Sequence, residues 1–346
     1  SEPKVGKDAA FETWAGLKSK TDDEYRISLK RLGLDSREAI PVFVSKIGSD
    51  KSHIRKAAIR GLGLIGNQDV ATALPALLQA TKDIDPGVRR DAVTGLGAIG
   101  ASPEIAVPAI VAVLEKDESY SAARALAKFG PKASSAIGSL TKAASYKEPL
   151  ARASAAEALG KIGPAAHSAT AVLRLRLKDE DDVVRGFAAR AIWQIEGTAS
   201  PELIDVLVEL LKTREISIGL HALETLGDIG PPAKKALPAL EAARMHEEGF
   251  FVAPAIWATG RIREEKDILP RLMLELKNEE PNARSSTAWA LGKMGPEARD
   301  VVPALRELAF DPRIGFGRLV VVQALEEIDG KEKTANWIES MERYKK

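Results

Sequence analysis

The sequence has 346 residues, of which 45% are hydrophobic but only 5% aromatic, so it can build a large core from small, closely packed side chains. Its 50 Lys and Arg nearly balance 49 Asp and Glu, which excludes a global field that attracts nucleic acid or an anionic membrane but allows a local basic patch. The absence of cysteine excludes disulfides, thiol nucleophiles and thiolate metal sites. No apolar run reaches the length of about 18 residues that a membrane-spanning helix needs.

The chain opens on Ser1-Glu2-Pro3-Lys4, without Met, a basic start or an apolar signal core. Two interpretations are open. An exported, periplasmic bacterial protein from which a leader was removed is slightly favoured, because a cysteine-free mature chain fits export. The alternative is a cytoplasmic protein with a trimmed terminus.

Two helices are predicted near the N-terminus, at about 9–17 and 22–32, with Thr21 or Asp22 as the N-cap. Their apolar side chains are Phe11, Trp14, Leu17, Tyr25 and Leu29. These residues come before a repeating array, and we expect them to cover the apolar face of its first unit.

A five-residue phrase, Leu62-Gly63-Leu64-Ile65-Gly66, returns with substitutions to the C-terminus. Aligning each unit on the apolar residue of this phrase gives anchors 30 to 34 residues apart. The anchors are Ile65, Ile99, Phe129, Ile162, Ile195, Ile229, Ile262, Met294 and Ile328. This period predicts about nine helix pairs over residues 36–330, an N-terminal helical cap over 1–35 and a C-terminal capping helix over 331–346.

Glycine and proline divide each unit into a first and a second helix. The last Gly of the phrase is predicted to take the left-handed conformation that stops the second helix, and a following Pro prevents its continuation. The inner Gly, such as Gly63, costs about 1 kcal/mol of helix propensity, so its recurrence predicts close backbone packing. A Pro in the first helix, such as Pro75 or Pro238, is predicted to bend that helix.

An arginine recurs ten residues before the anchor, after an acidic turn such as Asp85-Pro86-Gly87-Val88-Arg89. Its copies are Arg55, Arg89, Arg152, Arg185, Arg284 and Arg318. A cation in the first turn opposes the helix dipole unless an acid pairs with it. We therefore expect the acids of the preceding turn to pair with this structural ladder.

The Asp…Val-Arg…Ala-Leu-Gly-x-Ile-Gly pattern resembles the HEAT-repeat superfamily, most closely the short HEAT-like repeats of phycobilisome lyases and many bacterial scaffold proteins. The resemblance implies an all-α fold, a right-handed α-solenoid (superhelix) of antiparallel helix pairs whose second helices line the concave face. The pattern consists of core, cap and turn residues, so it is silent on function.

The sequence gives little support to the hypothesis that the chain is an enzyme. HEAT-like di-iron hydroxylases carry several His-Glu pairs, whereas this chain has one, His246-Glu247, among four scattered histidines. Ser217 near His221 is a weak pattern for a hydrolase. No lyase residue set is recognisable. We expect no catalytic residues, no metal and no cofactor.

Positions eight, five and one before each anchor lie outside the apolar stripe of the second helix, so we expect them to face the groove. They predict a partner-binding cluster on neighbouring units. Its residues are Phe187, Arg190, His221, Glu224, Trp257, Arg261, Trp289 and Lys293.

The two tryptophans allow two interpretations, exposed anchors or filling for an irregular core. Phe250-Phe251-Val252 stands where other units have a turn and Arg, and Pro254 lies within the second helix.

The sequence favours a non-enzymatic scaffold that binds a peptide or protein element in its concave groove, with bulk nucleic acid disfavoured. The alternatives are an accessory enzyme or lyase-like chaperone for a flat ligand, a chromophore or nucleobase, and a purely structural spacer.

Overall fold

The computed structural model describes residues 7–17, 22–213, 215–245, 249–315 and 317–343. All regular structure in these residues is helical, and nine helix pairs lie between Ile40 and Asp329, which confirms the predicted all-α solenoid. The chain divides into two compact units, Ser1–Gly197 (unit 1) and Thr198–Lys346 (unit 2). The predicted boundaries at residues 35 and 330 stay predictions.

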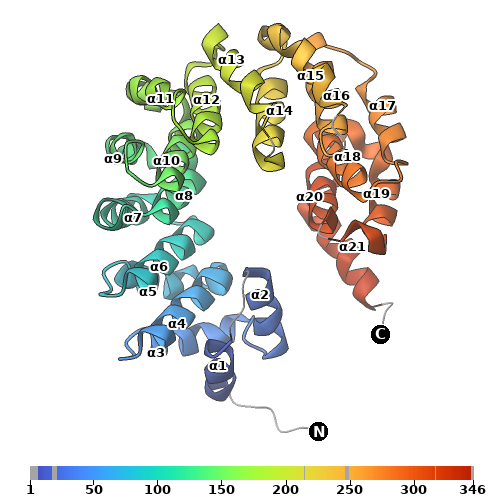
Figure 1. Ribbon diagram of the computed structural model, residues 1–346. Coiled ribbons are helices and arrows are strands. Elements are labelled where there is room, and N and C mark those ends of the chain that lie inside the picture. The colour runs from blue at the N-terminus through green and yellow to red at the C-terminus, as the bar shows by residue number, and fades with distance from the viewer. Residues whose placement is uncertain (1–6, 18–21, 214, 246–248, 316, 344–346) are drawn as a thin grey trace. The chain divides into compact units, whose positions relative to one another are not determined.

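Unit 1 stacks its helix pairs so that the first helices form one row and the second helices another (Figure 1). In chain order its elements are α1 (Lys7–Ala15), α2 (Asp22–Arg31), η1 (Arg37–Ala39), α3 (Ile40–Lys46), α4 (Ser52–Ile65), η2 (Gly66–Gln68), α5 (Val70–Ala80), α6 (Pro86–Ile99), α7 (Pro103–Asp117), α8 (Tyr120–Phe129), η3 (Gly130–Ala136), α9 (Ile137–Ala143), α10 (Pro149–Ile162), η4 (Gly163–Ala169), α11 (Thr170–Arg176) and α12 (Asp182–Glu196). The second-helix row is α4, α6, α8, α10 and α12.

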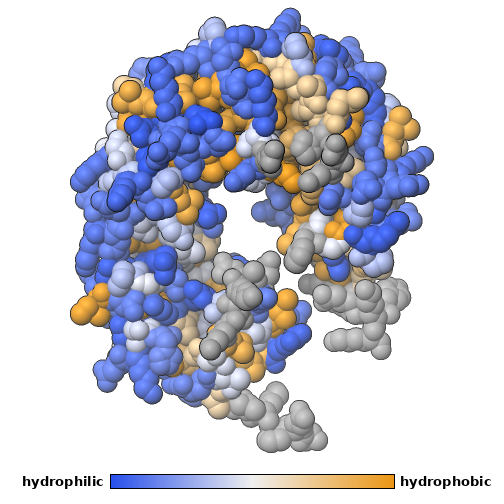
Figure 2. Space-filling view, viewed as in Figure 1, coloured by the Kyte–Doolittle hydropathy of each residue, from blue (hydrophilic) through white to orange (hydrophobic). Residues whose placement is uncertain are grey.

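Unit 2 repeats the plan, and its second-helix row is α14, α16, α18 and α20. Its elements are α13 (Pro201–Leu210), α14 (Ile216–Ile229), η5 (Pro231–Ala236), α15 (Leu237–Ala243), α16 (Val252–Arg263), α17 (Ile268–Glu275), α18 (Pro281–Met294), η6 (Gly295–Val301), α19 (Val302–Leu308), η7 (Pro312–Ile314), α20 (Gly317–Asp329) and α21 (Lys331–Arg343). In each unit hydrophilic residues cover much of the surface in view (Figure 2).

The N-terminal helix α1 packs on α3 and α4 through an aromatic cluster. Phe11 and Trp14 are fully buried, and their rings lie edge-on to Phe43 at centroid distances of 5.6 and 5.5 Å. Leu17, grouped with them in the sequence, is instead 37% exposed.

The closing glycines use three conformations. Gly66 stays in the right-handed helical region (φ −64°, ψ −16°) and leads directly into η2. Gly100 and Gly197 adopt the left-handed helical region expected of a C-cap. Where Pro follows, as at Gly163 and Gly230, φ is again positive (78° and 71°) but ψ is −147° and −141°. Pro excludes helical ψ values from the residue before it, and only glycine tolerates this alternative region. The expectation of a left-handed cap is therefore wrong before Pro and at Gly66, although the other closing glycines all have the positive φ that favours glycine.

The prolines of the first helices occupy two kinds of position. Pro75 and Pro108 lie inside α5 and α7, as predicted. Pro238 and Pro303 instead lie in the first turn of α15 and α19, each after a 3₁₀ segment that contains a kink. A first-turn Pro removes no helical hydrogen bond, so the bend comes from the kink in the 3₁₀ segment.

The inner glycines allow successive second helices to approach closely. A Cβ on Gly63 would lie 2.9 Å from the Cα of Gly95, and one on Gly160 would lie 2.9 Å from the Cα of Ala191. Real Cβ atoms do not approach backbone atoms this closely, so the predicted backbone packing is confirmed at these positions.

The arginine ladder links each repeat to the next. Arg89 donates from Nε and Nη2 to Asp117, 28 residues later, and from Nη1 to the carbonyls of Asp83 and Ile84 in its own turn. Arg55 pairs with Asp83 in the same way, and Arg284 pairs with Asp311.

The predicted pairing with the acid of the preceding turn is therefore wrong at these positions. Asp85, for example, is the N-cap of α6 and accepts from the amides of Gly87 and Val88. At Arg185, in contrast, the prediction is confirmed: Arg185 pairs with the preceding acid Asp182 and has Thr213, which is not an acid, 28 residues later.

These ion pairs predict loss of stability in acid. The hydrogen bond from Arg55 lowers the pKa of Asp83, and bonds from Arg313 lower the pKa of Asp311 to about 2. A depressed carboxyl pKa contributes stability that is present above the unfolded value of about 3.9 and is lost as pH falls through the folded value. We expect the Tm, followed by circular dichroism, to fall between about pH 4 and about pH 2.

The Asp83→Asn variant should show a shallower fall than the wild type, because its residue 83 has no proton to gain. Glu104→Gln, on an exposed side chain of α7, is the matched control and should follow the wild type. A wild-type Tm that stays constant down to about pH 2 would contradict the prediction.

Candidate groove in unit 2

The second helices of unit 2 border a cavity of about 540 Å³, within the range of about 300–1,000 Å³ typical of ligand pockets. We call it the unit 2 groove. Its lining residues are Ser217, Leu220, His221, Glu224, Phe250, Pro254, Asn282, Ser285, Ser286, Trp289, Gly317 and Val320. Three of them, His221, Glu224 and Trp289, belong to the predicted partner-binding cluster. Helix periodicity brings His221 and Glu224 to one face of α14, because they are three residues apart.

A lysine connects the acid of the groove to its aromatic wall. Lys293 Nζ on α18 donates to Glu224 Oε1 on α14 at 2.7 Å. The same Nζ lies 5.9 Å from the ring centroids of Trp257 and Trp289, within cation–π range. Glu224 and Lys293 are only 22% and 24% exposed in their side chains. The ion pair therefore fixes the position of both side chains and offsets their charges.

Trp257 belongs to the core. It is 3% exposed, and its ring fills a notch over Gly227, whose Cβ, if present, would lie 2.2 Å from a ring carbon. Phe251 fills a second notch in the same way over Gly219. The repacked-core interpretation is thus the right one for Trp257, because α16 places aromatic rings where other repeats place backbone against backbone.

Trp289, unlike Trp257, is accessible from the groove. It packs edge-on against Trp257, with centroids 5.6 Å apart and planes at 79°, but is only half-buried and lines the groove. Trp257 thus supports Trp289 from behind and leaves Trp289 as the accessible ring of the two.

The other predicted residues lie elsewhere. Arg261 is exposed on α16 but is not among the lining residues of the groove. Phe187 and Arg190 are half-buried on α12, in unit 1.

Three further lining residues stand at one of the positions that were predicted to face the groove. Pro254, Ser286 and Val320 each stand eight residues before an anchor, the same position as His221. That register predicts groove-facing positions even where the residue itself looks unremarkable.

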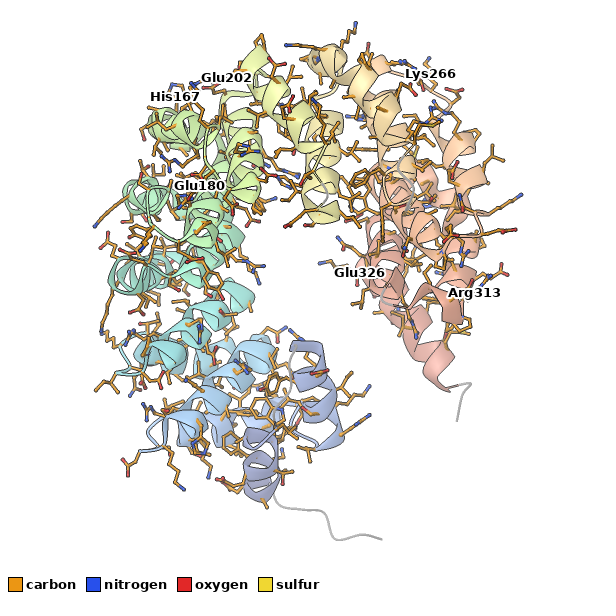
Figure 3. The ribbon with its side chains drawn as sticks, in the orientation of Figure 1. His167, Glu180, Glu202, Lys266, Arg313 and Glu326 are labelled. Carbon is orange, nitrogen blue, oxygen red and sulfur yellow. The ribbon has the colours of Figure 1, made fainter. Side chains whose placement is uncertain are left out.

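One acid of the groove is already engaged in an ion pair, and the described residues contain no candidate metal cluster. The carboxylate of Glu224 is held by Lys293, and no group of three His, Asp or Glu among the described residues could bind a metal ion. His167 lies on η4, away from the second-helix row (Figure 3). His246 and Glu247 fall outside the described residues. The geometry suits binding by a half-exposed ring beside fixed polar groups.

No helix in the described part of the chain has the length and apolarity to cross a membrane.

Models of two known families match repeats of this chain. A family model of HEAT repeats matches residues 116–192 and 170–258, and that of the PBS lyase HEAT-like repeat matches residues 88–116 and 283–311. No curated protein matches the sequence.

Two similar solved structures extend this likeness. The complex of CpcE and CpcF of phycocyanin lyase from Nostoc sp. PCC7120 has a TM-score of 0.50 and 24% identity, over 72% of this chain and 94% of that chain. An engineered protein has a TM-score of 0.45 and 21% identity, over 95% of this chain and 96% of that chain. At 24% identity the likeness to the phycocyanin lyase complex concerns the fold alone.

Proposed function

This chain is a HEAT-repeat protein, and we propose that it is a non-enzymatic scaffold that binds a peptide or protein element in the unit 2 groove. The observation that carries the proposal is the accessible ring of Trp289 on an open cavity of about 540 Å³. Half-exposed tryptophans beside apolar side chains are typical of interface hot spots. Leu220, Pro254 and Val320 supply the apolar surroundings, and His221, Asn282 and Ser285 add polar side chains to the lining.

A flat chromophore or nucleobase is the alternative occupant, since an aromatic ring also stacks on such ligands. An enzyme acting on it needs a proton donor or acceptor with an adjusted pKa. The acid of the groove is instead paired with Lys293. This pairing favours recognition over catalysis.

The Trp289→Ala variant should lose at least about 2 kcal/mol of binding, roughly 30-fold in Kd. The probe is a peptide selected on the full chain from a displayed library of random peptides, and its affinity is measured by fluorescence anisotropy. Val320→Asp, which places a charge on the apolar wall without removing the Trp pair, should weaken binding similarly.

Leu274→Ala is the matched control, because Leu274 is 68% exposed on α17, outside the second-helix row. It should bind as the wild type does, with unchanged helical circular dichroism. The scaffold proposal fails if selected peptides bind Trp289→Ala and Val320→Asp normally. It fails in favour of the alternative if only biliverdin or adenine binds and Trp289→Ala abolishes that binding.

A further inference from the structure

Charge is distributed unevenly between the two units. The sequence of unit 1 contains 29 Lys and Arg against 24 Asp and Glu, whereas unit 2 contains 21 against 25. The near-neutral whole chain therefore conceals a net charge of +5 on unit 1 and −4 on unit 2. A local field of this kind acts on partners within about a Debye length, roughly 8 Å at physiological salt.

Part of this positive charge follows α2 and the second-helix row of unit 1. We call these side chains the basic strip, and they are Arg26, Arg60, Arg90, Arg124, Lys128 and Lys161. They come from α2, α4, α6, α8 and α10, which succeed one another in unit 1 (Figure 1). The strip thus offers a cation on each successive helix.

Four residues of the basic strip surround one cavity of about 280 Å³: Arg26, Arg60, Arg90 and Lys128. Gly63 and Gly95, at which α4 and α6 approach closely, also line this cavity. Thr94 and Ser121 add hydroxyl groups to its lining. Cationic and hydroxyl groups around one cavity are suited to a carboxylate or another small oxyanion.

Two of these four cationic residues already have partners. Arg60 pairs with Asp91 at 3.3 Å and lies over the ring of Tyr25 at 4.7 Å. Arg26 donates to the carbonyl of Leu64 at 3.3 Å.

The other cations of the strip are less engaged. Arg124, Lys128 and Lys161 are exposed and make no ion pair with any described residue. Arg90 is exposed too, and it interacts electrostatically with Asp91 but makes no ion pair with a described residue. Such exposed cations attract anions.

We propose that the basic strip binds an acidic segment of a partner protein, with a carboxylate of that segment between Arg90 and Lys128. This site lies in unit 1 and does not depend on the unit 2 groove.

A peptide fits the strip better than a nucleic acid does. Asp91 lines the cavity and half-buried Glu157 lies on α10 at the register of Arg60 and Arg124. A nucleic acid carries closely and evenly spaced phosphates along its whole length, which these carboxylates repel. An acidic peptide can place neutral residues opposite them. The face of Tyr25 is also covered by Arg60, which removes it as a platform for base stacking.

The test measures anisotropy of a labelled peptide of roughly 12 alternating Glu and Gly residues with the full chain, at about 50 mM and about 300 mM salt. The wild type should bind the peptide, with affinity that falls at the higher salt. Arg90→Glu with Lys128→Glu should weaken binding at least tenfold. Arg90→Gln with Lys128→Gln removes the two positive charges without reversing them, so we expect an intermediate loss of affinity.

Lys132→Glu with Lys142→Glu is the matched control, because it changes the net charge by the same amount. These exposed lysines lie on η3 and α9, outside the second-helix row. Its affinity should stay within twofold of the wild type. The proposal is overturned if the acidic peptide does not bind, if both reversals lower affinity equally, or if the cavity variants bind normally. Tighter binding of a thymidine oligonucleotide of equal charge would overturn it in favour of nucleic acid.

Discussion

Replacing Arg152 with Met is expected to lower the free energy of unfolding by about 3–5 kcal/mol, the typical cost of removing one partner of a buried ion pair. Arg152 and Asp179 are 6% and 8% exposed, and two nitrogens of Arg152 donate to the carboxylate at 2.9 and 2.6 Å. Its remaining nitrogen donates to the carbonyls of Tyr146 and Lys147. Met preserves the apolar stem but leaves these acceptors without their donor.

The ion pair offsets the cost of burying the charged carboxylate of Asp179. Burial raises the pKa of Asp179, but hydrogen bonds from Arg152 and from the amide of Asp181 outweigh it and leave the pKa below its usual range. Without Arg152, only Arg176 and that amide still neutralise the buried charge. The burial cost is then largely uncompensated.

A double-mutant cycle separates this ion pair from general damage to the fold. Arg152→Met with Asp179→Asn should cost less than the sum of the two single changes, by about 0.5–3 kcal/mol. Arg124→Met, on an exposed arginine of α8 in the same unit, should stay within about 0.5 kcal/mol of the wild type. Urea unfolding followed by helical circular dichroism gives these values. A loss below about 0.5 kcal/mol for Arg152→Met would show that the ladder does not lock the repeats together.

The array could be predicted from the sequence because the glycines that mark its period recur at the same place in every well-conserved repeat. Gly63 and Gly160 recur where the backbones of successive second helices approach, and a Gly follows most of the second helices. The partner of the ladder arginine was missed because the pairing is not local. Asp179 comes 27 residues after Arg152 and belongs to the next repeat, so reading one unit at a time assigns the arginine to the wrong acid.

The groove was predicted in part, and the error at Trp257 has a clear physical source. The register five residues before the anchor is exposed or half-buried in every second helix except at Trp257. There Gly227 opens a notch on the neighbouring helix α14, and a large apolar ring gains more from filling it than from facing water. Such a notch depends on two repeats at once, so the periodicity of α16 alone does not reveal it.

Replacing Trp257 with Ala is expected to destabilise the protein by about 3–5 kcal/mol, the typical cost of deleting a buried aromatic side chain. Trp257 contacts both the Gly227 notch and the ring of Trp289, so the change leaves a cavity behind the groove wall. Trp289→Ala should cost less stability, because Trp289 is only half-buried. Urea unfolding followed by circular dichroism measures both losses.

The notch itself predicts that one substitution changes sign between two backgrounds. In the wild type, Gly227→Ala should cost about 1–3 kcal/mol, because the new methyl would lie 2.2 Å from the Trp257 ring. In the Trp257→Ala background the ring is gone, and the same change should stabilise by about 0.5–1 kcal/mol through helix propensity. Gly138→Ala in α9, where a Cβ meets no atom within 4 Å, should stabilise in both backgrounds. If Gly227→Ala were equally harmful in both, the notch would not be what holds Trp257 in the core, and its burial would need another cause.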